Sequence, residues 1–364
     1  MWLSLFMWLV VLVAAAACAA ASTPPLEPGN HTNNWVVLVD TSRFWFNYRH
    51  AGNVFSLYRI VRRLGVPDSH IILMVADGMA CEAQNPFPAQ LFSDEQRTKN
   101  VYGSEAEVDY RGTEVTAEAL MRVLTGRHAP EVPPSKRLLS DADSNVLLYL
   151  TGHGGDEFFK FQDAGEISSF DLADAFHSMR EKGRYRELLA VADTCQANTL
   201  QERLRSPGVA MVGSSRRSEN SWSKGANAAL GTTMADRFTD ATLEFVERRF
   251  PPGRAAPQPE PSLLEWLRAM DPSALASHPG WVSRLSRPLD RVPLADLFAA
   301  RPRRAVLAPS PPGPLPPPRS CRPRMRSTPP NALPLAEEPQ RRAELPQWLV
   351  LAVSSLALAA AFLL

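Results

Sequence analysis

Cysteine is scarce in this chain of 364 residues, which has four cysteines. They are Cys18, Cys81, Cys195 and Cys321, and no two of them form a Cys-x-x-Cys pair. This spacing excludes a framework of closely spaced disulfides, and it excludes a zinc module built from paired cysteines. Cys18 lies in a hydrophobic amino-terminal segment that we expect to be removed. The three that remain are an odd number, so at least one thiol is free or shared with another chain.

The chain also lacks an excess of charge of either sign. It has 39 Lys and Arg residues against 38 Asp and Glu residues, and its formal net charge is +1. No stretch interleaves basic and aromatic residues in the way that is typical of a nucleic-acid-binding surface. We therefore expect no nucleic acid among the partners of this protein.

Proline is abundant but unevenly placed, because 23 of the 33 prolines lie between Pro251 and Pro346. A dense run of prolines removes backbone donors and fixes φ, so it resists regular structure. The composition therefore predicts an ordered domain over residues 30–250 and a Pro/Arg-rich region and linker over residues 251–346.

The amino terminus is hydrophobic. Residues 1–21 form an apolar run that ends in small residues, and the pattern Ala19-x-Ala21 suits signal-peptidase cleavage before Ser22. We interpret residues 1–21 as a signal peptide, with an uncleaved anchor and a lipoprotein modified at Cys18 as alternatives. The sequence Asn30-His31-Thr32 is a glycosylation sequon, so a secreted chain would carry a glycan on Asn30.

The carboxyl terminus ends in a second hydrophobic run, residues 348–364. At about 1.5 Å per residue these positions form a helix of about 25 Å, which suffices for a thin bilayer such as that of the endoplasmic reticulum. Two interpretations remain. The run is either a C-terminal transmembrane helix or a GPI-attachment signal that is removed after a polar spacer.

Apolar runs and helical periodicities alternate along the ordered part. The patterns predict strands at residues 35–39, 71–76, 145–150, 188–192 and 209–212. They predict helices at residues 52–64, 116–124 and 169–179, and one of about twenty residues that ends near Arg249. In the third helix we expect Ser169 at the cap and Phe170, Ala173, Phe176 and Met179 on one face. This alternation indicates an α/β fold, a mainly parallel sheet with helices on both faces.

Two clusters follow predicted strands directly. His153 stands in Thr-Gly-His-Gly-Gly, and Cys195 stands in Asp-Thr-Cys. In open parallel sheets, sites form beyond the carboxyl ends of the strands, so we expect His153 and Cys195 to lie side by side. An imidazole that accepts the thiol proton produces a thiolate, which is a competent nucleophile. The sequence therefore predicts a Cys195–His153 catalytic pair.

Other groups near the pair have predicted roles. The backbone amides of Gly154 and Cys195 are candidate donors to a tetrahedral oxyanion. Asp193 has two interpretations, because it either neutralises a positive group in a substrate pocket or orients the local backbone. Zinc needs about four ligands, and the other cysteines are distant, so we expect no cofactor in the chemistry.

The two clusters resemble those of the legumain and caspase clan of cysteine peptidases. Several longer blocks over residues 33–250 are similar to the catalytic subunits of GPI transamidase within that clan. These blocks are residues 42–50 (SRFWFNYRH), 100–103 (NVYG), 108–111 (VDYR), 124–127 (LTGR), 135–141 (SKRLLSD), 151–155 (TGHGG), 161–163 (FQD) and 172–176 (LADAF). The similarity fades after Arg249.

The resemblance implies a caspase- or legumain-like catalytic domain in the lumen of the endoplasmic reticulum, on a single-pass type I membrane protein. The enzyme would cut the C-terminal signal from a proprotein and hold the new carboxyl end as a thioester on Cys195. The ethanolamine amine of a GPI anchor would then displace the thiolate. The family acts within a complex of several membrane subunits.

The resemblance also assigns roles residue by residue. It makes His153 the base, Cys195 the nucleophile and Asn47 a candidate third member of the site. It places Cys81 where the family has a disulfide to another subunit. It places Asp68, Ile71, Glu107 and Asp109 at a structural calcium site.

Two other hypotheses remain open. One is a legumain-like cysteine endopeptidase that acts alone, because the residues do not decide whether water or an amine attacks the thioester. The other is a GPI-anchored relative without enzymatic activity.

Overall fold

The structure is a computed structural model that describes residues 26–300, apart from residues 30, 105 and 254–259. The predicted signal peptide, the sequon residue Asn30 and the hydrophobic tail 348–364 lie outside the described residues, as does the stretch 301–346. None of the helices in the described part is long and apolar enough to cross a membrane.

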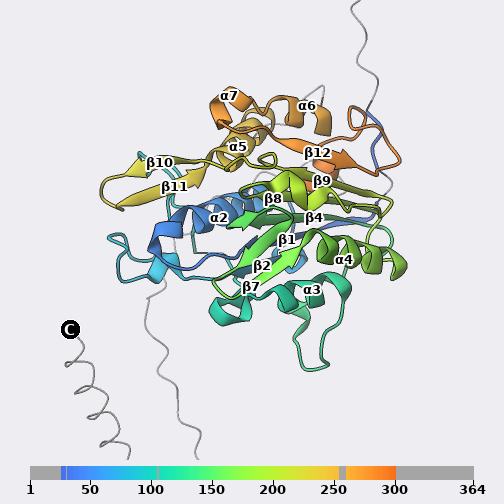
Figure 1. The fold of residues 1–364 in the computed structure, drawn as a ribbon, viewed down its shortest axis with the longest axis horizontal. Helices are drawn as coiled ribbons and strands as arrows, with labels where there is room; N and C mark the ends of the chain where they lie inside the picture. Colours follow the sequence, from blue (N-terminus) through green and yellow to red (C-terminus); the bar gives the residue numbers. More distant parts are fainter. Residues whose placement is uncertain (1–25, 30, 105, 254–259, 301–364) are drawn as a thin grey trace, which may run out of the picture. The chain divides into compact units, whose positions relative to one another are not determined.

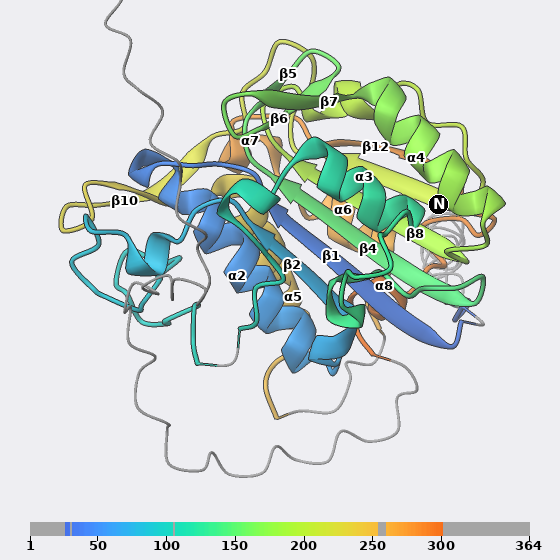
Figure 2. The same ribbon diagram turned by 90° about the horizontal axis from the view of Figure 1, so that it is seen from below.

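The centre of the domain is a seven-stranded sheet in the order β12-β9-β8-β4-β1-β2-β3 (Figures 1 and 2). Its strands are β1 (Asn33–Asp40), β2 (Ile71–Val75), β3 (Tyr110–Arg111), β4 (Ser144–Thr151), β8 (Glu187–Asp193), β9 (Val209–Gly213) and β12 (Gly280–Ser283). Five neighbouring pairs run parallel, and β12 pairs antiparallel with β9. The predicted mainly parallel sheet is confirmed.

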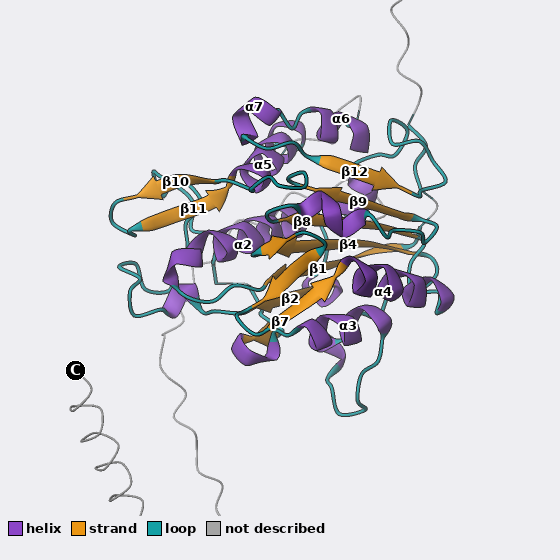
Figure 3. Ribbon diagram, viewed as in Figure 1, coloured by secondary structure: helices purple, strands orange, loops and turns teal. Residues whose placement is uncertain are grey.

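Helices cover both faces of this sheet, as Figure 3 shows. One face packs against α2 (Tyr48–Arg63) and α5 (Arg237–Arg249), and the other packs against α3 (Ala117–Thr125) and α4 (Ser169–Glu181). Each face of the sheet has its own hydrophobic core, and successive residues of β1 point to opposite faces. Val36 and Leu38 belong to the core on the side of α2 and α5, whereas Val37 and Val39 belong to the core on the side of α3 and α4. Burial on both faces explains why the strands are continuous apolar runs.

Helix α4 differs in detail from the prediction. Its N-cap is Ser168 and not Ser169. The Ser168 hydroxyl accepts a hydrogen bond from the backbone amide of Asp171 in a capping box. The face that packs on the core also differs from the prediction, and Phe170 is 57% exposed. The buried face consists of Leu172, Ala175, Phe176 and Met179. The prediction was wrong at Phe170 and Ala173, because the buried positions recur at spacings of three and four residues from Leu172 and not from Phe170.

The folded domain extends beyond the boundary predicted at residue 250. The elements that follow are α6 (Leu263–Arg268), α7 (Pro272–Leu275), β12 and α8 (Ala295–Phe298). Trp266 and Phe298 are fully buried, with ring centroids 5.8 Å apart. Proline content misplaced this boundary, since Pro272 occupies the first position of a helix, where proline is tolerated.

Two small sheets had no predicted counterpart. The first contains β5 (Gly154–Gly155), β6 (Phe158–Phe161) and β7 (Gly165–Ser168), and the second is the hairpin of β10 (Ser223–Asn227) and β11 (Thr232–Asp236). The hairpin and α5, which has 13 residues, occupy the segment where one long helix was expected. Short 3-10 turns complete the fold, at Trp45–Asn47 (η1), Asp68–His70 (η2), Met79–Cys81 (η3), Gly112–Glu114 (η4), Pro134–Lys136 (η5) and Ala197–Gln201 (η6).

Candidate active site

The register of the central strands brings the two predicted clusters together. β4 and β8 are parallel neighbours, and Thr151 pairs with Asp193 at their carboxyl ends. His153 lies two residues after Thr151, and Cys195 lies two residues after Asp193. On its other side Thr151 pairs with Asp40, the last residue of β1, so the segment after β1 flanks the same site. The predicted placement of His153 and Cys195 at adjacent strand ends is confirmed.

Asn47, in η1, holds the imidazole of His153. The Oδ1 atom of Asn47 lies 2.8 Å from Nε2 of His153. The Nδ2 atom of Asn47 donates to the carbonyl of Arg43 at 2.6 Å, which fixes the orientation of the amide. Since Oδ1 can only accept, Nε2 of His153 carries the proton in the neutral ring. The free lone pair is then on Nδ1, which is the atom available to accept the thiol proton.

The surroundings of His153 favour its neutral form. The ring packs edge to face against buried His50, with centroids 5.3 Å apart. This partial desolvation lowers the pKa of His153, and the positive charges of Arg49 and Lys160 lower it further, while Asp163 acts in the opposite direction. A neutral imidazole at pH 7 is the form that acts as a general base.

Cys195 lies in the turn between β8 and η6, is half-buried, and is the free cysteine of the described residues. The amides on either side of it are engaged. Thr194 donates to the Ser214 hydroxyl at 3.2 Å, and Gln196 donates to the Glu219 carbonyl at 2.9 Å. The amide of Cys195 has no acceptor within the described part of the chain, so it is available to an oxyanion.

Gly154, the second predicted oxyanion donor, approaches the same turn closely. A Cβ atom at this position would lie 2.7 Å from the Thr194 hydroxyl and 2.8 Å from the Phe158 carbonyl oxygen. No side chain fits there, so only glycine lets this backbone pass beside the residue that precedes Cys195.

No hydrogen bond joins Cys195 to His153, both of which the structure describes. Catalytic hydrogen bonds are often long in a substrate-free enzyme and tighten when substrate binds.

Asp193 is buried behind the catalytic turn. Its carboxylate accepts from the Ser221 hydroxyl at 2.6 Å and from the Thr239 hydroxyl at 2.5 Å. Burial raises its pKa, and these hydrogen bonds act against that effect. The contacts join β8 to the start of α5 and to the segment before β10, which fits the second predicted role of Asp193, the orientation of the backbone.

A buried polar network beside His153 was not predicted. Asp236, the last residue of β11, accepts from Arg49 Nε at 3.1 Å and from Asn53 Nδ2 at 2.6 Å. Its carboxylate also lies 3.6 Å from Nε2 of His50. Burial and the negative charge of Asp193 raise the pKa of Asp236 to about 7. Arg49 and His50 stand in a block that had been singled out, but nothing in the sequence around Asp236 predicted its strand.

The predicted calcium residues are partly brought together. Asp68 accepts from the Tyr58 hydroxyl at 2.6 Å, and Ile71 follows it at the start of β2. Burial raises the pKa of Asp109 to about 6, and the charges of Asp68 and Glu107 add to that increase. A cation would relieve this repulsion, so the donors suit calcium chemically. Even so, the described residues contain no cluster of three or more His, Cys, Asp or Glu that could hold a metal ion as placed.

Cys81 closes η3. The predicted pairing with another chain stays a prediction.

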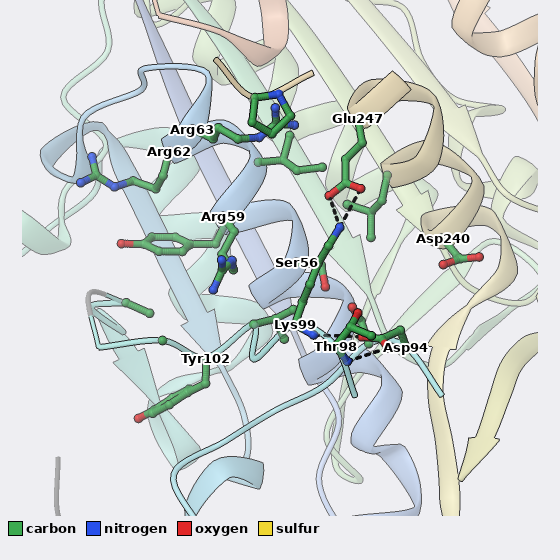
Figure 4. A pocket seen from close by; sticks show the side chains of 18 of the residues that line it. Ser56, Arg59, Arg62, Arg63, Asp94, Thr98, Lys99, Tyr102, Asp240 and Glu247 are labelled. Atoms are coloured by element: carbon green, nitrogen blue, oxygen red, sulfur yellow. Dashed lines mark hydrogen bonds and ion pairs between the residues drawn. The ribbon is translucent and has the colours of Figure 1, made fainter. Parts of the chain in front are cut away.

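A cavity of about 800 Å³ lies away from the catalytic pair, between α2, α5 and the loop around residue 100 (Figure 4). Arg59 and Lys99 line it, and Lys99 forms an ion pair with Glu247 at 2.9 Å across it. Its walls mix acidic and basic side chains and contain none of the predicted catalytic residues.

Comparisons with known proteins find relatives in sequence. GPI-anchor transamidase of Mus musculus is 57% identical over 217 residues, which are 60% of this chain and 55% of that protein. Putative GPI-anchor transamidase of Drosophila melanogaster is 50% identical over 281 residues, 76% of this chain and 77% of that protein. The chain thus spans about half the length of the mouse relative. Caspase-1 from Spodoptera frugiperda superposes with a TM-score of 0.42 and 13% identity, over 77% of this chain and 95% of that one.

The family assignment follows from a match over most of the folded domain. The family model for the peptidase C13 family covers residues 34–251, from β1 to just past α5, and so includes Asn47, His153 and Cys195. The chain belongs to the peptidase C13 family.

Proposed function

We propose that this chain is the catalytic subunit of a GPI transamidase. The observation that carries the proposal is that His153 and the free Cys195 follow the carboxyl ends of two adjacent parallel strands, in a chain whose relatives include GPI-anchor transamidases. The cysteine-peptidase chemistry needs only these side chains and two backbone amides.

In the first step Cys195 is acylated. His153 Nδ1 accepts the thiol proton, and the sulfur attacks the carbonyl carbon at the end of the mature proprotein. The carbonyl oxygen becomes an oxyanion that the amides of Cys195 and Gly154 stabilise; losing one such donor typically costs about 3 kcal/mol. The C–N bond then breaks, and His153 gives its proton to the leaving amine of the C-terminal signal.

In the second step the thioester is transferred. The amine of a GPI ethanolamine phosphate attacks the thioester carbon, and His153 Nδ1 accepts a proton from that amine. The C–S bond breaks, and the sulfur leaves as the thiolate that begins the next cycle. Attack by water would give hydrolysis instead, which is the reaction of a stand-alone endopeptidase.

The proposed location is the membrane of the endoplasmic reticulum, with the catalytic domain in the lumen and one C-terminal transmembrane helix. The proposed partners are the other subunits of the complex, one of them linked through Cys81. The location, the complex and the linkage rest on the resemblance to GPI transamidases, whereas the topology rests on the hydrophobic ends of the sequence.

We also propose a structural calcium ion held by Asp68, Glu107, Asp109 and the backbone carbonyl of Ile71. Its support is that burial, and then the charges of Asp68 and Glu107, raise the pKa of Asp109 to about 6, because a bound cation would relieve both effects. Calcium added to chelator-treated full-length chain in detergent should raise the unfolding midpoint, and Asp109→Asn should remove the increase while Asp163→Asn keeps it. Equal midpoints with and without calcium would exclude the ion.

Complementation tests the main proposal. Cells that lack their own catalytic subunit should regain GPI-anchored proteins at the surface when they express this chain, but not when they express Cys195→Ala. Rescue by Cys195→Ala would refute the enzymatic role. Efficient peptide cleavage by the purified chain without partners would favour the endopeptidase, and a mature protein that ends before Trp348 would favour the GPI-anchored relative.

A further inference from the structure

Exposed aromatic side chains gather beside the active site. Six large hydrophobic side chains are exposed in the described residues, and Phe44 and Phe46, at 47% and 62%, flank the start of η1. Their rings are stacked, with centroids 6.0 Å apart and planes 16° apart. A stacked pair of exposed rings offers an apolar surface to solvent, which is typical of a binding surface.

The backbone holds Phe44 in an unusual conformation. Its φ of 72° and ψ of 147° lie at the edge of a region that is nearly restricted to glycine. The amide of Phe44 donates to the Asp77 carboxylate at 2.8 Å, which maintains this conformation. Such strain persists where the surroundings enforce it and is concentrated at functional sites. The backbone conformation that Asp77 maintains therefore keeps the Phe44 ring exposed to solvent.

A positive charge adjoins this aromatic surface. The guanidinium carbon of Arg43 lies 5.3 Å from the centroid of the Phe44 ring. Arg43 is exposed and forms no ion pair or side-chain hydrogen bond with any described residue. The patch formed by Arg43, Phe44 and Phe46 therefore combines an apolar plane with an uncompensated cation.

The patch is connected to the catalytic base by one side chain. Asn47 donates to the carbonyl of Arg43 at 2.6 Å and contacts His153 at 2.8 Å. In the proposed reaction Cys195 keeps the acyl group, while His153 exchanges protons with the leaving amine and the incoming amine. A patch on the side of Asn47 and His153 therefore suits the amine side of the reaction.

We propose that Arg43, Phe44 and Phe46 bind the phosphate and the adjoining sugar of the acceptor glycolipid. This inference rests on the proposed transamidase function. The incoming amine is two carbons from a phosphate, which a guanidinium binds with charge-assisted hydrogen bonds. The C–H face of a sugar packs against the π face of an aromatic ring. The leaving peptide has no obligatory negative charge, so an uncompensated arginine favours the acceptor over the leaving group.

A partition experiment tests the assignment. Membranes from cells that lack their own catalytic subunit, and that express this chain, are given a proprotein with GPI glycolipid and hydroxylamine as competing acceptors. The ratio of glycolipid product to hydroxamate should fall about tenfold in Arg43→Gln, which is the factor for losing one charge-assisted contact. It should also fall in Phe44→Gly, which removes the ring that packs on the sugar. Only folded enzyme forms either product. The ratio of glycolipid product to hydroxamate therefore does not depend on the fraction of the enzyme that folds. Glycine also accepts the φ of Phe44.

Phe170→Ala is the matched control, because Phe170 is an exposed ring on α4 with the Arg203 guanidinium 4.5 Å above it. Its ratio should equal that of the unmodified chain. Equal losses of both products in the patch variants would show that the patch binds the proprotein or its leaving segment, and would overturn the assignment. An unchanged ratio would overturn it as well. No glycolipid product from the unmodified chain would refute the transamidase function, and this inference with it.

Discussion

The Oδ1 atom of Asn47 lies 2.8 Å from Nε2 of His153, and the Arg43 carbonyl fixes which end of the amide faces the ring. This contact selects the tautomer that carries its proton on Nε2. Nδ1 is then unprotonated and free to serve Cys195. A neutral amide orients the ring without adding a charge that would raise its pKa.

Removing this amide should impair the chemical step. In Asn47→Ala the imidazole can rotate and take the other tautomer, so we expect kcat to fall about 100-fold, the lower end of what positioned acid–base groups contribute. KM should change little, because Asn47 contacts the base and the backbone. Single-turnover acylation of Cys195 measures the step directly. An acylation rate within about twofold of the original would show that Asn47 does not orient His153.

The pH dependence should respond to two exposed charges in opposite directions. The reaction needs neutral His153, whose pKa lies below its ordinary value of 6.5, so activity should fall on the acidic side below that value. Lys160→Gln removes a charge that lowers this pKa, so the acidic limb should move to higher pH. Asp163→Asn removes a charge that raises it, so the limb should move to lower pH.

The acidic limb of kcat/KM for each variant measures these shifts. Both should shrink at high salt, because the charges are exposed and are screened by ions. Shifts in the same direction, or shifts that salt leaves unchanged, would contradict the electrostatic account of His153.

Glycine at position 154 should be required for catalysis. In Gly154→Ala the new Cβ would meet the Phe158 carbonyl oxygen at 2.8 Å, so the strand and its amide must move. Displacement of one oxyanion donor should lower kcat by about 100- to 1,000-fold. Gly165→Ala is the control, since its Cβ would meet only ordinary contacts, the nearest at 3.6 Å, in the same small sheet. Equal activity of the two variants would exclude Gly154 from the oxyanion site.

The placement of His153 and Cys195 at adjacent strand ends could be predicted because its signal is local. His153 and Cys195 directly follow apolar runs that β-sheet burial explains, and parallel neighbours place their carboxyl ends together. Asp236 could not be found in this way. Its strand lies in a short, partly polar hairpin. The Asp236 carboxylate accepts hydrogen bonds from Arg49 and Asn53, which are nearly 190 residues away in sequence. A contact between residues so far apart leaves no pattern in the sequence around Asp236.

The end of the domain was misjudged for a related reason. Proline density predicts a loose region, yet Trp266 and Phe298 belong to the core that α5 covers. The buried ion pairs of Arg287 with Glu187 and Asp296 attach this segment to the start of β8. Composition averages over a long window, whereas packing depends on a few apolar side chains within it.

The segment after residue 250 should therefore be needed for stability. Trp266→Ala removes a fully buried ring and should cost about 3–5 kcal/mol of unfolding free energy. Trp281→Ala in the same segment should cost far less, because Trp281 is 39% exposed. Urea unfolding of the full-length chain in detergent, followed by tryptophan fluorescence, measures both. Similar losses in the two variants would show that this segment does not complete the core.

Whether Cys195 carries the acyl group can be read from the mass of the Cys195 peptide after a proprotein is added to the assembled complex without glycolipid. We expect an adduct with the mass of the cleaved proprotein, linked through a hydroxylamine-sensitive thioester. The adduct should disappear when glycolipid is supplied, and the product should carry the glycolipid. A complex that modifies the proprotein with no acyl adduct on Cys195, or that retains activity in Cys195→Ala, would contradict it.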